Sequence, residues 1–422
     1  MIVVENKHID GTVFYSYDGT TARVCMEFVV SRDPLLRFEH LLPSLSRKLL
    51  PCPVEGRETT YHFWARNALY HGLRFLGLSS GNKVLVPAFH CRTVVEPVIQ
   101  FGCEVVFYNI HQDGSIDFED LAGKIDLHTK ALLAIHYFGV LQPVQQLREF
   151  CQEHGLFLIE DCAHILCGDI DGEAIGSFGD ISIFSWRKFF PMPDGGVLVR
   201  NRDFPQASID WERLTVWGQM KIIKNLIEQA IHDSTRQEQV VSLHADMDVS
   251  PSEVSSIEGE NVLPQVMANN HQVAEFDYSQ VNWPMSQWSQ SILKNIDLPS
   301  IVQKRKDNTK ALFSAMNELA DIHPWGSVGA TNICTWAFPV VATTRRDLHV
   351  KLRKRGIQAF SWDGVIHPAL ALEKFPEAKF LYEHLVLLPN QQSLSQHDIH
   401  LVIEGVKDVL SNGGCSQQAV QS

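Results

Sequence analysis

Two short stretches of this sequence end in residues that could do chemistry together. They are FLIEDCAH at residues 157–164 and FSWRKFFPMPDGG at residues 184–196. Each follows or contains an apolar run typical of a buried strand, and each then delivers a charged side chain, Asp161 or Lys188. The carboxyl ends of parallel strands meet at one edge of a sheet, where ligands bind. If the two strands are neighbours, Asp161 and Lys188 face one cavity.

A lysine and a carboxylate at one sheet edge are what a pyridoxal phosphate enzyme needs. The amine forms a Schiff base with the cofactor aldehyde, and the carboxylate keeps the pyridine nitrogen protonated. The expected helix at 64–77 offers a phosphate cradle, because Arg66, Asn67 and Ala68 at its start would present free backbone N–H groups. The hydroxyl of Ser185, before the lysine, could add a further contact.

Each of these features also has a simpler structural explanation. Lys188 could be an exposed loop lysine beside Arg187, and Asp161 could cap a helix that starts at residue 162. His164 could be a core histidine whose hydrogen bonds are satisfied, and the Asp-Gly-Gly sequence at 194–196 could form only a turn. The spacing of the residues alone leaves the catalytic and structural interpretations evenly balanced.

The elements that must position these residues form an alternating pattern from residue 59 to about residue 200. Short apolar strands separated by helices predict a mostly parallel sheet covered on both faces. The strands are expected at 83–87, 103–108, 131–136, 156–160, 181–185 and 196–199, and the helices at 64–77, 92–101, 117–124 and 143–153. A small α/β unit is expected to follow, with strands at 333–342 and 386–390 and helices at 345–356 and 396–410.

Composition divides the chain further. Residues near 234–275 are rich in Ser, Gln, Glu and Asn, which favours a mobile insertion or a lid. The expected organisation is an N-terminal extension at 1–58, a large cofactor-binding domain at 59–233, the insertion at 234–277, an interface helix with a small C-terminal domain at 278–410, and a disordered tail at 411–422.

The charge and cysteine content argue against several classes of protein. With 36 basic and 49 acidic residues the net charge is −13, which disfavours a nucleic-acid partner. The sequence shows no signal-peptide pattern and no apolar stretch of about eighteen residues, so no membrane association is expected. The nine cysteines form no CxxC motif and no paired Cys/His spacing, which predicts no metal site and favours reduced thiols in a cytoplasmic protein.

Four stretches, in this order, resemble the DegT/DnrJ/EryC1/StrS family of sugar aminotransferases. They are GNKVLVPAFH (81–90), TKALLAIHYFG (129–139), IEDCAH with GSFGD (159–180), and FSWRKFFPMPDGG (184–196). The C-terminal stretches RRDLHVKLRKRGI and FPEAKFLYEHLVLLP are also similar to the family. The resemblance covers about residues 59–201 and 278–410.

The resemblance implies an α/β chain with the PLP-dependent transferase fold type I, like aspartate aminotransferase. That fold has a large domain with a mixed, mostly parallel seven-stranded sheet, a small C-terminal α/β domain, and a homodimer with sites at the subunit interface. Carried over by position, Lys188 is the lysine that binds the cofactor, Asp161 is the partner of the pyridine nitrogen, and His164 lies near the cofactor ring.

The remaining cofactor contacts follow from the same resemblance. Asn67 and Ala68 take the phosphate positions, with Ser185 as the strand-end serine, and Asn282 is the candidate that reaches the phosphate from the partner subunit. This chain departs from the family where Arg66-Asn67 replaces Gly-Thr, where the lysine loop is about two residues shorter, and where Cys91 replaces the aromatic that stacks on the ring. Either the neighbouring His90 stacks on the ring, or the ring is held differently.

The activity implied is transamination, from an amino-acid donor such as glutamate to a keto sugar carried on a nucleotide. Two alternatives stay open. One is an elimination reaction on the same fold, with Lys188 still acting as the cofactor lysine. The other is a catalytically inactive relative that acts as a binding partner, which the departures at Arg66-Asn67 and Cys91 motivate.

Overall fold

The structure is a computed structural model, and it describes residues 13–17, 20–24, 30–41, 56–204, 208–216, 218–220, 222–231, 276–326, 328, 332–344, 346–362 and 365–411. Of the predicted insertion at 234–277, only residues 276 and 277 are among the described residues. Of the predicted tail at 411–422, only Ser411 is among the described residues.

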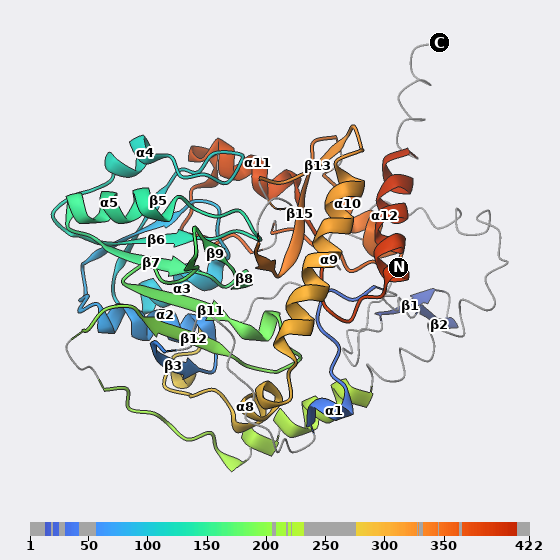
Figure 1. Cartoon of the computed structure of the whole chain (residues 1–422), viewed down its shortest axis with the longest axis horizontal. Helices are drawn as coiled ribbons and strands as arrows, with labels where there is room; N and C mark the ends of the chain where they lie inside the picture. The colour runs from blue at the N-terminus through green and yellow to red at the C-terminus, as the bar shows by residue number, and fades with distance from the viewer. Residues whose placement is uncertain are drawn as a thin grey trace, which may run out of the picture.

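A mixed sheet of seven strands forms the larger part of the molecule (Figure 1). In sheet order its strands are β3 (Glu58–His62), β12 (Gly196–Arg200), β11 (Ile181–Ser185), β7 (Phe157–Asp161), β6 (Thr129–Ile135), β4 (Lys83–Pro87) and β5 (Glu104–Tyr108). The strands from β11 to β5 are parallel, and β12 runs antiparallel to both of its neighbours. The predicted sheet is thus confirmed.

The edge strand β3 was absent from the predicted strands. Its sequence, ETTYH, contains no apolar run, and only its last residue, His62, is buried. An edge strand needs no such run, because one of its sides pairs with β12 while the other faces away from the sheet. The five inner strands carry mostly buried side chains, whereas the other edge strand, β5, was predicted from its apolar run although only its last residue, Tyr108, is buried.

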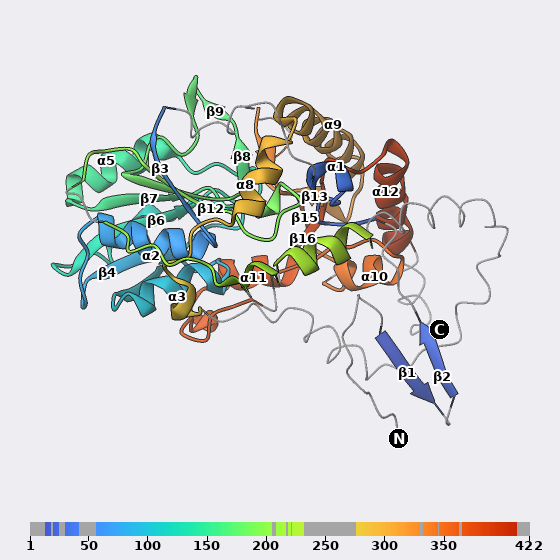
Figure 2. The ribbon, with the colours of Figure 1, turned by 90° about the horizontal axis from the view of Figure 1, so that it is seen from below.

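Helices cover both faces of this sheet (Figure 2). Helices α2 (Ala65–Phe75) and α3 (Arg92–Gln100) lie on one face, and α5 (Val144–His154) lies on the other. α4 (Phe118–Ala122) precedes β6. α2 lies close to the sheet, because a Cβ atom added at its Gly72 would be 2.5 Å from the Cδ1 of Ile181. The C-terminal half of α2 therefore packs closely against β11.

The C-terminal part has its own sheet and its own hydrophobic core. Its three antiparallel strands are β13 (Ile322–Pro324), β15 (Ala337–Ala342) and β16 (Leu385–Pro389). The helices of this part are α8 (Gln287–Lys294), α9 (Leu298–Met316), α10 (Leu348–Lys354), α11 (Pro376–His384) and α12 (Gln396–Ser411). The predicted strand at 386–390 and helix at 396–410 are each met to within one residue, the strand expected at 333–342 is divided into β14 (Cys334–Thr335) and β15, and the helix expected at 345–356 spans only Leu348–Lys354. Strand β13 and helix α11 were not predicted.

Two short pairings join distant parts of the chain. β8 (Ile165–Cys167), which follows β7, pairs antiparallel with β14 (Cys334–Thr335), which precedes β15. Near the N-terminus, Val30 forms a bridge with Ile357, so residues 30–36 run along the C-terminal unit. None of the helices in the described ranges combines the length and hydrophobicity that a membrane crossing requires.

Candidate active site

The ends of β6, β7 and β11 bring the predicted catalytic residues to one place. In the sheet register, Asp161 at the end of β7 lies beside Ile135 of β6 and Ile183 of β11. β11 continues two residues further to Ser185, and a single turn of 3-10 helix then carries Lys188. The two strands are neighbours, which is the condition on which the sequence-based hypothesis depended.

A cavity of about 650 Å³, partly open to solvent, lies at this edge of the sheet. It is lined by Trp64, Ala65, Arg66, Leu69, Cys91, Thr93, Val94, Ile135, Asp161, Ala163, His164, Ile183, Ser185, Arg187, Lys188 and Trp362. A second hollow of about 1230 Å³ adjoins it and shares Cys91, Thr93, Arg187, Lys188 and Trp362 with it. We call the first the inner cavity and the second the outer hollow.

Lys188 lies where the two spaces meet. Its side chain is half-buried, and its Nζ lies 4.6 Å from the ring centre of Trp336. Burial lowers the pKa of Lys188 to about 8, although the nearby Asp161 carboxylate acts in the opposite direction. An amine with this pKa is partly neutral near physiological pH, as a nucleophile or a base must be.

Asp161 is the acidic partner on the floor of the inner cavity. It is 6% exposed, and its Oδ1 accepts a hydrogen bond from the backbone N–H of Ala163 at 2.9 Å. Burial raises the pKa of this carboxyl, while the hydrogen bond from Ala163 and the positive charge of Lys188 lower it. A cationic ring nitrogen bound in the cavity would supply the counter-charge that a buried carboxylate needs.

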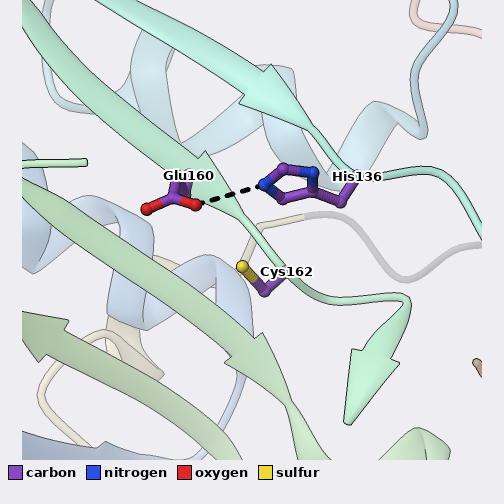
Figure 3. A group of neighbouring side chains, drawn as sticks. All are labelled: His136, Glu160 and Cys162. Atoms are coloured by element: carbon purple, nitrogen blue, oxygen red, sulfur yellow. Dashed lines mark hydrogen bonds and ion pairs between the residues drawn. The ribbon is translucent and has the colours of Figure 1, made fainter. Parts of the chain in front are cut away.

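The neighbouring Glu160 has a structural environment instead (Figure 3). Its oxygens accept hydrogen bonds from the backbone N–H groups of Phe178, Gly179 and Gly176, and one of them pairs with His136 Nε2 at 3.2 Å. Side chains alternate along a strand, so Glu160 points to the opposite face from Asp161. Glu160 therefore fixes the loop that leads into β11.

Figure 3 also shows Cys162 beside this pair, and the three side chains place possible metal ligands within 4.8 Å of one another. Their hydrogen bonding fits a structural network better than a metal site. Because His136 Nδ1 accepts a hydrogen bond from the N–H of Gln142, its Nε2 carries the proton that points at Glu160. Burial raises the pKa of the Cys162 thiol well above its ordinary value, which keeps it protonated.

His164 forms the next part of the wall. Its ring stacks on Phe138, with ring centres 4.3 Å apart, and lies nearly parallel to Trp336 at 5.7 Å. Among the described residues its Nδ1 has no hydrogen-bond partner, although the side chain is buried. Burial lowers its pKa well below the ordinary value, so the ring is neutral. A buried polar atom without a partner at a cavity wall is a candidate ligand contact.

The residues that follow the lysine are more than a turn. The buried Asp194 accepts a hydrogen bond from the N–H of Ser286 at 2.9 Å. A Cβ atom at Gly196 would overlap the backbone of Trp64 and Ala65, so only glycine lets β12 approach the start of α2 this closely. The motif thereby holds the lysine turn against the start of that helix.

The start of α2 differs in detail from the sequence-based expectation. The N–H groups of Asn67 and Ala68 both donate to the carbonyl of Trp64, at 3.0 and 3.1 Å, so neither is available to a phosphate. The Asn67 side chain donates to the carbonyl of Gln280 at 2.7 Å. We therefore correct the expected cradle. Ala65 and Arg66, the two residues before Asn67, line the inner cavity, and Ser185 lines it as predicted.

Two further predicted contacts lie away from the inner cavity. His90 is completely buried, stacks on Phe107 at 5.0 Å, and points its Nδ1 at the carbonyl of Pro87 at 2.9 Å. Cys91 lines the cavity in its place, so the alternative in which the ring is held differently fits better. Asn282 donates to Glu212 at 3.4 Å and lines neither space. Its contact with a partner subunit stays a prediction.

Sequence analysis missed the aromatic wall opposite the strand ends. The outer hollow is lined by Trp336, Phe360 and Trp362, which come from the C-terminal unit. The backbone N–H of Trp336 donates to the carbonyl of His164 at 3.0 Å. Arg32, from the N-terminal segment, lines the same hollow. Single aromatic residues and a single arginine carry no local signal of this kind.

The residues present fit pyridoxal phosphate. Lys188 can attach an aldehyde, the buried Asp161 can pair with a ring nitrogen, and the buried Nδ1 of His164 awaits a partner. The first residues of α2 and Ser185 also line the cavity, and the N-terminal end of a helix favours an anion.

The fold is that of the PLP-dependent aminotransferases. Helicobacter pylori PseC, an aminotransferase involved in the biosynthesis of pseudoaminic acid, has a TM-score of 0.62 at 19% identity, with 92% of this chain and 100% of that chain covered. The PLP form of the putative sugar aminotransferase Spr1654 from Streptococcus pneumoniae has a TM-score of 0.59 at 20% identity, covering 84% of this chain and 87% of that one.

The sequence comparisons match part of this chain to one family. Residues 65–221 match the model of the DegT/DnrJ/EryC1/StrS aminotransferase family, which confirms the resemblance drawn from the motifs. GDP-perosamine synthase of Vibrio cholerae is 38% identical over 139 residues, which are 32% of this chain and 38% of that protein. A UDP-N-acetyl-3-dehydro-alpha-D-glucosamine 3-aminotransferase of Acidithiobacillus ferrooxidans is 34% identical over 140 residues, 32% of this chain and 37% of that protein. The matches thus span less than two fifths of these relatives.

Proposed function

We propose that this protein is a PLP-dependent aminotransferase that transfers an amino group from an amino acid, glutamate or a similar donor, to a keto sugar carried on a nucleotide. The observation that carries the proposal is that Lys188 and Asp161 line one cavity at the ends of neighbouring parallel strands. The sugar substrate is supported by the relatives, which include a GDP-perosamine synthase and an aminotransferase named for a UDP-linked dehydro sugar.

Pyridoxal phosphate, when bound, supplies a ring that accepts electrons from the substrate carbon. Lys188 holds the cofactor covalently and, once displaced by the donor, accepts and returns a proton, for which its pKa of about 8 is suited. Asp161 keeps the ring nitrogen protonated, and the neutral His164 offers Nδ1 to a polar group of the ring. The roles of both residues are part of this proposal.

For the phosphate we propose Ala65, Arg66 and Ser185 in place of Asn67 and Ala68. They line the inner cavity at the N-terminal end of α2, where the helix dipole favours an anion. The guanidinium of Arg66 adds a positive charge that the Gly-Thr pair of the family lacks. It lies 5.4 Å from the ring centre of Trp64, which also lines this cavity.

We further propose a homodimer in the cytoplasm. Apolar side chains stand exposed on the segment that follows the large sheet: Trp211, Val216, Met220, Ile227 and Ile231. A row of such side chains on a single chain is typical of a surface covered by a partner. The six cysteines among the described residues are free thiols, which suits a reducing compartment.

The test begins with the cofactor. The purified protein is incubated with pyridoxal phosphate, reduced with borohydride, and digested, and the labelled peptide is sequenced. The label is expected on Lys188. The loaded protein is then given glutamate and a panel of nucleotide-linked keto sugars, and the product is weighed by mass spectrometry. Label on another lysine, or none, contradicts the cofactor assignment. A product formed without an amino donor indicates elimination instead.

A further inference from the structure

The outer hollow carries an unexplained arginine. Arg32 belongs to the N-terminal segment, outside the matched residues 65–221, yet it lines the same hollow as Lys188. Its guanidinium carbon lies 5.0 Å from the ring centre of Phe360 and 6.0 Å from that of Trp336. Since Lys188 Nζ lies 4.6 Å from the same Trp336 ring, a compact ligand can touch both cationic groups.

The position of Arg32 is fixed by its backbone. Its N–H donates to Gln358 Oε1 at 3.0 Å, and the preceding Val30 exchanges two hydrogen bonds with Gly356 and Gln358, both at 3.0 Å. These contacts do not involve the guanidinium. A substitution of the side chain therefore leaves the attachment of the segment intact, so the role of the side chain can be tested separately.

One edge of the guanidinium already binds a carboxylate. Nε and Nη2 of Arg32 donate to Asp33, at distances from 2.8 to 3.3 Å. The Nη1 donors have no hydrogen-bond partner among the residues that the structure describes, and the side chain is 25% exposed. The guanidinium is therefore held in place by Asp33 and still has N–H donors available to a ligand in the outer hollow.

The charge of the hollow selects the kind of ligand. Arg32, Arg187 and Lys188 line it together with a single carboxylate, Asp33, so it favours an anion. The carboxylate of Asp33, which is half exposed beside Arg32, repels other anions. The position therefore suits a single carboxylate better than a doubly charged diphosphate. Aromatic walls lower the local dielectric and strengthen the contact.

We propose that Arg32 binds a carboxylate of the amino donor during the first half of the reaction. The planar guanidinium matches a carboxylate in shape and charge, and every amino-acid donor carries one. The donor amine must reach the position of Lys188, and the Arg32 guanidinium lies near the same indole ring as that amine, at 6.0 Å against 4.6 Å from the ring centre. The proposal rests on the proposed aminotransferase function and names the residue that recognises its donor.

The experiment measures the donor half-reaction alone. Protein loaded with pyridoxal phosphate is mixed with glutamate, without a sugar, and the change in its visible spectrum gives the second-order rate constant. Arg32→Ala and Arg32→Gln are expected to lower it by about 10- to 100-fold. Arg37→Ala is the matched control, because Arg37 lies on the same segment but lines neither the cavity nor the outer hollow. It should react like the wild type.

Binding provides a second measurement that does not depend on turnover. Titration with 2-methylglutamate, which lacks the α-hydrogen, should show a similar rise in the half-saturating concentration for the Arg32 variants and none for Arg37→Ala. Cofactor content and melting temperature should stay at the wild-type level in all three variants.

The outcomes separate this proposal from the function on which it rests. If wild type binds pyridoxal phosphate but reacts with no amino acid, both proposals fail. If wild type reacts and the Arg32 variants match it in both measurements, only the role of Arg32 is refuted. Variants that react normally with glutamate but lose affinity for the nucleotide sugar also refute it, and assign Arg32 to the acceptor.

Discussion

The two sides of the candidate site, named after their proposed ligands, the cofactor and the amino donor, are built differently. On the cofactor side, Asp161, His164 and Lys188 lie within short stretches at the ends of parallel strands. On the donor side, the walls come from Arg32 and from Trp336, which belong to segments far apart in the sequence. The first side lies within the region that matches the family model, and the second lies outside it.

This difference concerns how a side chain is held in place. The cofactor side is fixed by strand register and by backbone hydrogen bonds to Glu160, so its geometry is settled locally. The donor side is fixed by hydrogen bonds between segments that are far apart in the sequence. We expect the cofactor side to tolerate little change and the donor side to tune the choice of substrate. The Arg32 variants test the donor side, and four experiments test the cofactor side.

The largest effect is expected from Lys188→Ala. Removing the amine removes both the covalent hold on the cofactor and the proton carrier, so amino transfer should fall by about 1,000-fold or more. The rate of amino-sugar formation measures this. Lys304→Ala, at a half-buried position on α9 that lines neither cavity nor outer hollow, is the control and should keep its activity. Near-normal rates in Lys188→Ala would show that another residue carries the cofactor.

The adjacent carboxylates on β7 should separate into one chemical and one structural role. Asp161→Asn should lower activity by about 100-fold with little loss of stability, because an amide cannot hold the ring nitrogen protonated. Glu160→Gln should cost about 3 kcal/mol of the free energy of unfolding, because a charged acceptor of several backbone N–H groups is replaced.

Denaturant unfolding and initial rates on the same protein preparations measure both quantities for the two carboxylate variants. An equal loss of stability in the two variants would contradict the division of roles. So would a Glu160→Gln variant that unfolds like the wild type but has lost amino transfer.

The pH dependence of cofactor capture should show the lowered pKa of Lys188. Only the neutral amine attacks an aldehyde, so the capture rate should rise about tenfold per pH unit below pH 8 and level off above it. An ordinary lysine would continue to rise toward its usual pKa of 10.5. Stopped-flow absorbance of apoprotein mixed with pyridoxal phosphate gives the profile. Nα-acetyl-lysine, which keeps its side-chain amine free, serves as the reference. An identical pH profile for the protein and this compound would show that the site does not perturb the amine.

The smallest effects concern the phosphate. Ser185→Ala should weaken binding of pyridoxal phosphate by about fivefold and leave binding of pyridoxal unchanged, because one hydrogen bond to a charged group is lost. Asn67→Ala should leave the affinity for both compounds unchanged and reduce stability by about 1 kcal/mol, since its amide bonds the carbonyl of Gln280. Equilibrium titrations distinguish the two. If Asn67→Ala alone weakened phosphate binding, the original prediction of a cradle at Asn67 would be restored.

Much of the fold was predictable because its signals are local. Apolar runs marked the five inner strands and the edge strand β5, and Gly155 ends α5 in the left-handed conformation that glycine favours, with φ of 65°. β3 escaped prediction because an edge strand needs few apolar residues. The pairing of β8 with β14 joins residues 165–167 to 334–335, and no local pattern predicts such a contact.

The site was also predictable only where its residues lie at the ends of predicted strands. The order of Asp161, His164 and Lys188 placed them at one sheet edge, because strand ends in a parallel sheet point the same way. The helix start was predicted to within one residue, but the N–H groups of Asn67 and Ala68, which were expected to be free, both donate to the carbonyl of Trp64. His90 was expected near the cofactor, but the chain buries it against Phe107 and turns Cys91 toward the cavity.

The hydrogen bond between Trp336 and His164 has a consequence for how the protein is made. A ribosome delivers the N-terminal part first, so a nascent chain already contains Lys188 and Asp161 long before the tryptophan emerges. The wall beside the lysine is supplied only when the segment around Trp336 docks on β8. Capture of the cofactor in the completed site is therefore expected only after the segment around Trp336 has been synthesised, late in the production of each molecule.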